Sequence, residues 1–437
     1  MPFKTLLSYN PIKTLRRKKK NFYIQESHLR DIFFLALQCR LDCDPGYVSQ
    51  RAPIITCVDG RYEPFRPSTF ICQPAAVLVI TEKGDVEIFS NKPECQSNVT
   101  ENFANFTGFG RTLSLLDDQI LLVGGDLNAT KHTYVNIQHP RQGLHAMKYT
   151  IEKFPLGGSP HAHTSFGSGN RLLVIGGAHR TRAKFEDFTW NSLDLRKPDG
   201  TKFTTFVSSP CLVKISRDEY LILGGEQKNR NGTFAIDSVF KVNITSEVIE
   251  RKPPMLTKRM KHSCEKLSEN SVLVSGGKAL LSGDLLHDEI YFWEDGMSTA
   301  IEAKESLMRF QHQLVRIGET IFALGGLTEQ NKGSTTVEKF ETGCVKKMDD
   351  YKDCRWIKHE QNLISKDVAN LVVTSFPQSA IDCGIECQCG IEKSRERIIG
   401  GVESAQYYPW IAAMIMDKNR DASYVESHCS AMLVCST

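Results

Sequence analysis

Short apolar runs that end in a glycine pair recur along the chain at a nearly constant interval. Five segments share this form, and the first glycine of each pair is Gly124, Gly176, Gly224, Gly276 or Gly325. The intervals between these glycines are 52, 48, 52 and 49 residues. A single pair carries little information, but five pairs in one register indicate an internal repeat of about 50 residues.

The pattern inside each repeat predicts about four β-strands. The apolar residues before a glycine pair do not alternate with polar ones, which is typical of a strand buried on both faces. Glycine permits backbone angles and close approaches that a side chain would prevent. Another strand precedes the apolar run, as in SSPCLVKI, and an aromatic strand follows it, with Tyr134, Trp190, Phe240, Tyr291 and Trp293, or Phe340. Four strands per 50 residues is the content of one β-propeller blade.

These repeats resemble the kelch family, in which spaced aromatic residues follow a glycine pair. The resemblance covers residues 75–375, although the tryptophan expected after each tyrosine is mostly missing, and Trp356 is the clearest one present. Residues 75–89 have the form of a unit without its glycine pair and its preceding strand, and residues 368–375 supply a matching strand. Pairing of the two would remove exposed sheet edges. The resemblance implies an all-β fold with a kelch-like propeller of about six blades.

The composition is that of a folded protein and excludes several kinds of partner. The chain carries 54 Lys and Arg against 51 Asp and Glu, a net charge of +3, with 41% hydrophobic residues. This balance argues against a disordered chain and against a dedicated nucleic-acid binder. No apolar run approaches the roughly 18 residues that a membrane span needs. We therefore expect no nucleic-acid partner and no membrane span, and no pattern indicates a cofactor.

Fourteen cysteines and five Asn-x-Ser/Thr triplets favour secretion into an oxidising compartment. Zinc binding is the competing interpretation, but paired ligand spacings are absent, and we expect no metal. Cys344 and Cys354 could close a loop in the last repeat, whereas Cys211 and Cys264 could join neighbouring blades or remain free thiols. An intracellular kelch adaptor would leave these features without a use. The candidate glycosylation sites are Asn98, Asn105, Asn128, Asn231 and Asn243.

The segment before the propeller resembles the second half of a sushi (complement control protein) module. It reads CDPGYV from Cys43, then Cys57, GRY ending at Tyr62, and Cys72, and we assign residues 39–73 to this partial module. The family's pairing implies a Cys43 to Cys72 bond and an earlier partner for Cys57, for which Cys39 is the only candidate. Residues 1–38, with a basic run at 16–20, are expected to form a disordered tail, and the true beginning of the protein is expected to be missing.

The segment after the propeller resembles the start of a trypsin-like serine protease of the chymotrypsin fold. Its features are Arg397 followed by Ile-Ile-Gly-Gly, then Pro-Trp ending at Trp410, and a later cysteine at Cys429. The resemblance implies activation by cleavage between Arg397 and Ile398, after which the new α-amino group would pair with a buried aspartate and order the oxyanion hole. Cys389 resembles the propeptide cysteine that tethers the light chain. Residues 376–397 would be the propeptide linker, and 398–437 a truncated start of an incomplete barrel.

The chain lacks the groups that this chemistry requires. Acyl transfer needs a serine, a histidine and an aspartate, and none of the family's triad motifs lies before Thr437. We therefore expect no peptidase activity from these residues alone. The leading hypothesis is the regulatory and binding portion of a secreted trypsin-like zymogen, with an activating protease and with extracellular protein or glycan ligands on the propeller loops. The alternative is a non-catalytic secreted propeller that binds proteins or glycans.

Overall fold

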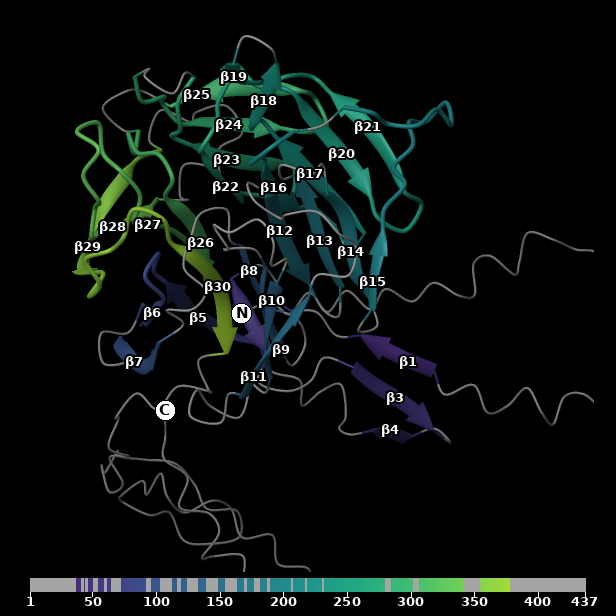
Figure 1. The fold of residues 1–437 in the computed structure, drawn as a ribbon, viewed down its shortest axis with the longest axis horizontal. Coiled ribbons are helices and arrows are strands. Elements are labelled where there is room, and N and C mark those ends of the chain that lie inside the picture. The colour runs from purple at the N-terminus through teal and green to yellow at the C-terminus, as the bar shows by residue number, and fades with distance from the viewer. Residues whose placement is uncertain are drawn as a thin grey trace, which may run out of the picture. The chain divides into compact units, whose positions relative to one another are not determined.

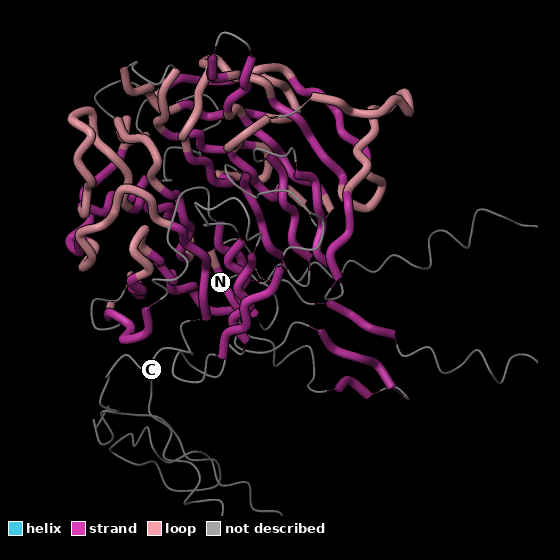
Figure 2. The backbone as a smooth tube through the Cα atoms, viewed as in Figure 1, coloured by secondary structure: helices cyan, strands magenta, loops and turns pink. Residues whose placement is uncertain are grey.

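The computed structural model describes an all-β chain, and its described residues contain no helix (Figure 2). From 189 to 377 the description is continuous apart from 206, 217, 230–231, 280–283, 302–305 and 342–353. Before that it covers 37–40, 43, 46–49, 54–58, 61–63, 72–91, 96–102, 112–115, 119–123, 133–138, 148–153, 163–168, 171–176 and 181–186. Contacts divide the chain into Met1–Ile381 and Asp382–Thr437, and the second unit lies outside the described residues.

Five four-stranded antiparallel sheets follow one another along the chain (Figure 1). The first two contain β8 (Thr112–Leu115), β9 (Gln119–Val123), β10 (Thr133–Gln138) and β11 (Lys148–Lys153), then β12 (His163–Ser168), β13 (Arg171–Gly176), β14 (Thr181–Glu186) and β15 (Thr189–Ser192). The third contains β16 (Cys211–Lys214), β17 (Glu219–Leu223), β20 (Val239–Asn243) and β21 (Val248–Lys252), with a hairpin of β18 (Glu226–Asn229) and β19 (Gly232–Ala235) beside it in sequence. The last two contain β22 (Ser263–Lys266), β23 (Ser271–Ser275), β24 (Glu289–Phe292) and β25 (Met297–Ala300), then β26 (Gln313–Ile317), β27 (Thr320–Leu324), β28 (Thr336–Phe340) and β29 (Trp356–Asn362).

A further sheet joins segments from the two ends of the described chain. It contains β2 (Tyr47–Ser49), β5 (Cys72–Ile80), β6 (Asp85–Phe89), β7 (Ser97–Asn102) and β30 (Val372–Pro377). Strand β30 pairs with β5 in antiparallel register from Val372 opposite Ile80 to Pro377 opposite Ala75. The predicted pairing of residues 368–375 with residues 75–89 is therefore confirmed. The edge of β5 that would otherwise lack backbone partners is covered along its second half.

Neighbouring sheets touch through their innermost strands, which gives a propeller-like arrangement. Contacts connect β30 with β8, β8 with β12, β12 with β16, β16 with β22, β22 with β26, and β26 with β30. Sheets that follow one another in the sequence therefore also lie side by side in space. Figure 1 shows the strands of successive sheets fanning out from this inner set.

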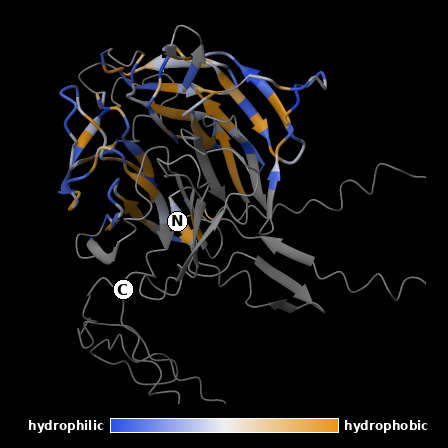
Figure 3. Cartoon of the chain, viewed as in Figure 1, coloured by the Kyte–Doolittle hydropathy of each residue, from blue (hydrophilic) through white to orange (hydrophobic). Residues whose placement is uncertain are grey.

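The hydrophobic core lies between adjacent sheets rather than in one central mass. One cluster combines Leu221 and Leu223 of β17 with Val272 and Val274 of β23, and another combines Ile290 of β24 with residues of β27. Every residue of β23 is buried, and so are the last four residues of β17 and of β27. The prediction of strands buried on both faces is confirmed for these three runs. The apolar colour in Figure 3 accordingly lies mostly on strands, while the hydrophilic colour covers many loops and some of the strands.

The described glycine pairs are the joints between neighbouring sheets. Both glycines of the pairs that begin at Gly224, Gly276 and Gly325 have positive φ, between 55° and 102°. The second glycine of each pair donates its N–H to a carbonyl that lies four residues before the next innermost strand. These bonds run from Gly225 to Arg259 at 2.9 Å, from Gly277 to Arg309 at 2.8 Å, and from Gly326 to Val368 at 2.8 Å. The glycine period of the sequence is thus the period of the inter-sheet contact.

The strands before Cys72 do not form one uniform module. Strands β1 (Leu37–Arg40), β3 (Ile54–Val58) and β4 (Arg61–Glu63) make a separate three-stranded sheet, whereas β2 pairs with β5. The Gly46 carbonyl accepts bonds from Ala75 N at 2.9 Å and from Gly318 N at 2.8 Å. This segment therefore bridges the sheet that contains β5 and the turn between β26 and β27. The proposed boundary at residue 73 divides β5, and β1 begins two residues before the assigned start of the sushi-like segment.

Candidate functional site

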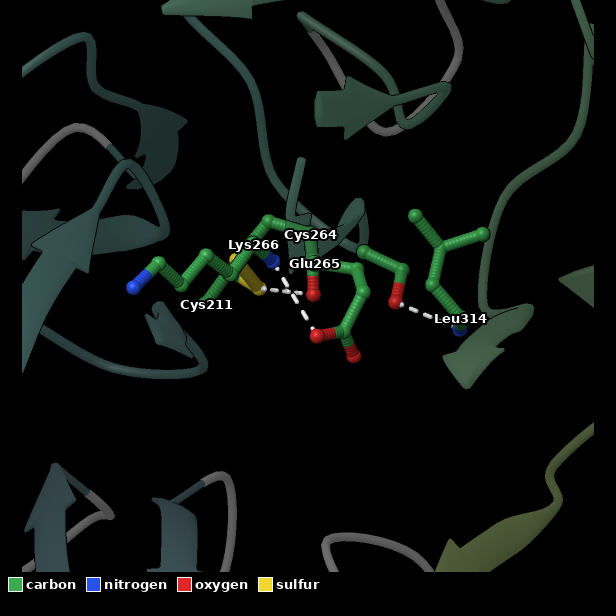
Figure 4. The surroundings of a disulfide bond; sticks show 6 residues. Cys211, Cys264, Glu265, Lys266 and Leu314 are labelled. Carbon is green, nitrogen blue, oxygen red and sulfur yellow. Dashed lines mark hydrogen bonds between the residues drawn. A yellow bond between two sulfur atoms is a disulfide. The ribbon is translucent and has the colours of Figure 1, made fainter. Parts of the chain in front are cut away.

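Two disulfide bonds have both cysteines among the described residues. Cys43 bonds to Cys72 with a Cα–Cα distance of 5.7 Å, which is the pairing that the sushi resemblance implies. Cys211 bonds to Cys264 with a Cα–Cα distance of 6.0 Å, so these residues are not free thiols. Because Cys211 lies on β16 and Cys264 on β22, the second bond joins the innermost strands of two neighbouring sheets. Figure 4 shows this bond, with Glu265 and Lys266 following it on β22.

The remaining predicted cysteines and the cleavage site are only partly within the described chain. Cys57 lies on β3 opposite Leu37 and Tyr62 in the backbone register. Cys354 is half of a disulfide, and its other half is not among the described residues. The other predicted positions lie outside the described residues: Cys344, Cys389, Cys429, Arg397 and Ile398.

Two of the five candidate glycosylation asparagines lie in described segments. Asn98 is on β7, and Asn243 ends β20. The Asn243 Oδ1 atom accepts bonds from the Thr245 N–H at 3.1 Å and the Ser246 N–H at 2.9 Å, which fixes the turn that follows the strand. Asn105, Asn128 and Asn231 lie outside the described residues.

Two buried arginine–glutamate pairs occupy equivalent places in neighbouring sheets. Arg259 Nη2 lies 3.0 Å from Glu289 Oε2, and the two side chains are 1% and 2% exposed. Arg309 pairs with Glu338 in the next sheet. Arg259 also donates to the Gly276 carbonyl at 2.7 Å, as Arg309 does to the Gly325 carbonyl at 3.2 Å. Each arginine therefore links the segment just before an innermost strand to the glycine pair of the same sheet.

A third glutamate stands at the same register position, and no arginine among the described residues pairs with it. Glu87 lies opposite Val79, as Glu289 lies opposite Val274 and Glu338 opposite Ala323. Its carboxylate accepts backbone bonds from Ile364 at 2.8 Å and Ser365 at 3.1 Å. Each of these buried carboxylates has a partner within the fold, an arginine for Glu289 and Glu338 and two backbone N–H groups for Glu87, so we assign them to the architecture and not to chemistry on a ligand.

A serine, a histidine and an aspartate meet in the core, but they do not form a hydrolytic site. His312 Nε2 lies 3.2 Å from Ser275 Oγ, and Ser275 also bonds to Asp288. The exposed fractions of His312, Ser275 and Asp288 are 1%, 0% and 0%, so no substrate reaches the hydroxyl. A catalytic arrangement also places the histidine between the serine and the aspartate, whereas here the serine is in the middle.

The buried histidines predict a loss of stability in acid. Burial lowers the pKa of His262 and of His312 to about 3, and a nearby arginine cation acts in the same direction. Below pH 6.5 the unfolded chain therefore takes up protons that the folded chain refuses, so stability falls as the pH falls from about 6.5 toward 3. We expect the stability advantage of the wild type over His312→Gln to shrink by about 2 kcal/mol between pH 6.5 and 4.5. Urea unfolding at both pH values measures this, and parallel pH profiles would contradict it.

A candidate binding site in the described part of the chain is a cavity of about 230 Å³ between the sheets β22–β25 and β26–β29. It is lined by Met260, Lys261, Lys278, Phe310, Gln311, Leu327 and Asn331. Lys278 follows the Gly276–Gly277 pair, and its backbone bonds to Met260 in both directions, at 2.9 and 3.0 Å. Leu327 follows the next glycine pair and bonds to Phe310 in the same way, at 2.8 and 3.1 Å. The glycine joints therefore position the walls of the cavity.

Lys278 and strained backbone give this cavity its chemical character. Lys278 is 9% exposed as a whole residue, and its Nζ lies 4.1 Å from the centre of the Phe310 ring. Lys261, Gln311 and Asn331 have positive φ of 55°, 59° and 58°. Non-glycine residues with such angles cost energy and concentrate at ligand sites. Sequence reasoning missed the cavity, although a lysine after a glycine pair is visible in SGGK.

Comparison of the chain with protein-family models and with curated protein sequences finds no match. Among the residues that the structure describes, no group of three or more His, Cys, Asp or Glu side chains could hold a metal ion. The same residues include no helix that could span a membrane. Functional inference therefore depends on the sequence motifs and on the cavity.

Proposed function

We propose that this chain is the regulatory and binding portion of a secreted trypsin-like serine protease zymogen. The observation that carries the proteolytic part is the sequence of Arg397 followed by Ile-Ile-Gly-Gly, with Trp410 and Cys429 beyond it. Two disulfides support an oxidising, extracellular setting, because such bonds persist mainly there. The glycosylation sites, the partial sushi module at 39–73 and the kelch relationship of the propeller belong to the same proposal.

The binding part of the proposal rests on a propeller of six blades. Two observations support this number. There are six sheets of four or five strands, and their innermost strands contact one another in a closed series that starts and ends at β30. A ring of sheets holds its loops on a rigid frame, and binding residues are commonly found on loops so positioned. The separate sheet of β1, β3 and β4 would add a second surface.

Activation would begin at the bond between Arg397 and Ile398. Its cleavage frees an α-amino group on Ile398, and in the family that cation orders the oxyanion hole of the catalytic domain. This chain would supply the switch and the binding surface, and a catalytic domain would supply the triad.

Cleavage by trypsin tests the zymogen proposal. We expect brief digestion of the folded protein to produce a fragment whose N-terminal sequence starts at Ile398, before the propeller is degraded. Arg397→Gln should abolish this fragment, whereas the matched control Arg395→Gln should preserve it. N-terminal sequencing and intact-mass analysis give the readout. Preferred cleavage elsewhere in both variants would contradict the assignment of Arg397 as the activation residue.

The alternative function is a non-catalytic secreted propeller that binds proteins or glycans. The cavity beside Lys278 favours it, because a binding site needs neither the triad nor the activation bond. Retained ligand binding together with no cleavage between Arg397 and Ile398 would select this alternative.

A further inference from the structure

The cavity between the last two sheets holds a cation whose partner is missing from the described part of the chain. As a whole residue Lys278 is 9% exposed, and among the described residues its ammonium group has no hydrogen bond or ion pair; the group it contacts is the Phe310 ring. Packing against the ring removes part of the hydration of the ammonium group, and the aromatic face offsets only part of that loss. A carboxylate would compensate the charge fully through charge-assisted hydrogen bonds.

The other lining residues fit a carboxylate on a short aliphatic stem. Met260, Phe310 and Leu327 supply apolar walls, while Lys261 and the Gln311 and Asn331 amides supply polar groups. Lys261 lies near Glu226 and opposes the rise that burial causes in the pKa of that carboxyl. Lys261 is thus partly matched, which leaves Lys278 as the main unmatched cation.

The volume of the cavity indicates how much of a ligand enters it. Sites for whole small molecules usually measure about 300–1,000 Å³. A cavity of about 230 Å³ is smaller and suits one side chain of a larger partner. Its walls come from two sheets fixed by the glycine joints, so it is formed before the partner arrives and loses little entropy on binding.

We propose that this cavity captures a glutamate or aspartate side chain of an acidic protein segment, with Lys278 as its charge partner. The proposal rests on the binding role assigned to the propeller and specifies the ligand chemistry of that role. It does not depend on cleavage at Arg397.

A displayed library of random peptides, selected on the full chain, tests the proposal. We expect enrichment of peptides that contain Glu or Asp, and a loss of affinity of about tenfold or more when that residue becomes Gln or Asn. Lys278→Met, which keeps the stem beside Phe310, should weaken binding to a similar degree. Lys278→Arg should restore part of the affinity, and Lys197→Met, an exposed lysine of the same charge, should leave binding as in the wild type.

Several results would overturn the proposal. These are enriched peptides without acidic residues, no enrichment at all, or acidic peptides that bind Lys278→Met as tightly as the wild type. Binding of sialylated glycans that depends on Lys278, in the absence of peptide binding, would assign the cavity to a glycan carboxylate instead. Peptides that bind independently of Lys278 would refute the assignment of the cavity as the peptide site, but they would leave the binding role of the propeller in place. The Arg397 digest reports on the zymogen separately.

Discussion

Replacing Arg259 by methionine is expected to lower the free energy of unfolding by about 3–5 kcal/mol, because it leaves Glu289 as a buried charge without its partner. The ion pair is almost completely shielded from water, with side chains 1% and 2% exposed. The guanidinium also donates to the carbonyls of Gly276 and His287, and the substitution leaves these acceptors without it. Methionine keeps most of the aliphatic volume, so the loss reports on charge and hydrogen bonding rather than on a cavity.

The pH dependence and a surface control make this prediction specific. Burial raises the pKa of Glu289 while Arg259 opposes that rise, so without the arginine the carboxyl takes up a proton more readily. The cost of Arg259→Met should therefore be smaller at pH 5 than at pH 8. Arg196→Met removes an exposed pair with Asp194 and should change stability by less than about 1 kcal/mol.

Urea unfolding of Arg259→Met, Glu289→Leu and the double variant measures the coupling. We expect the double variant to be more stable than Arg259→Met alone, because it removes the stranded charge. Two results would contradict the inferred stabilisation of the sheet by the buried pair. One is additive losses of unfolding free energy in the double variant, and the other is a loss for Arg259→Met no larger than for Arg196→Met.

The sequence pattern predicted the repeating parts of the fold because each repeat makes the same contact. The glycine period, the doubly buried runs and the pairing of residues 368–375 all follow from backbone geometry that recurs in every unit. The Arg259 and His262 pair recurs at Arg309 and His312, fifty residues later, and this recurrence is visible in the sequence alone. Its meaning depends on Glu289 and Glu338, which lie some thirty residues further along the chain and meet the arginines only in the folded sheets.

The parts that could not be predicted depend on contacts between different units. Pairing of Tyr47 with Pro74, and the bond from Gly318 to the Gly46 carbonyl, join segments with no shared pattern. Lys278 reads as an ordinary exposed lysine until Phe310 of the next sheet is placed over it. Likewise, Cys211 and Cys264 form a disulfide bond because the innermost strands of neighbouring sheets lie side by side.

Gly276 is the position where the addition of one methyl group should cost most. A Cβ atom there would lie 2.0 Å from the Arg309 carbonyl oxygen and 3.0 Å from the His312 ring, with φ at +57°. The carbonyl cannot yield easily, because it accepts the inter-sheet bond from Gly277 N at 2.8 Å. Gly276→Ala therefore combines the backbone cost of positive φ, about 1–2 kcal/mol, with a backbone clash of about 1–3 kcal/mol.

Gly200→Ala separates these two contributions, because Gly200 has φ of +80° and no atom within 4 Å of an added Cβ. Thermal and urea unfolding should show a loss of about 1–2 kcal/mol for Gly200→Ala and a further loss of about 1–3 kcal/mol for Gly276→Ala. The extra loss has a consequence for binding, since Phe310 and Gln311 directly follow Arg309 and line the cavity. A displaced Arg309 carbonyl should move both residues, so Gly276→Ala should also weaken acidic-peptide binding at temperatures where the protein remains folded. Equal losses for the two alanine variants, with unchanged binding, would mean that the glycine pair serves only backbone conformation and does not set the spacing between sheets on which the cavity depends.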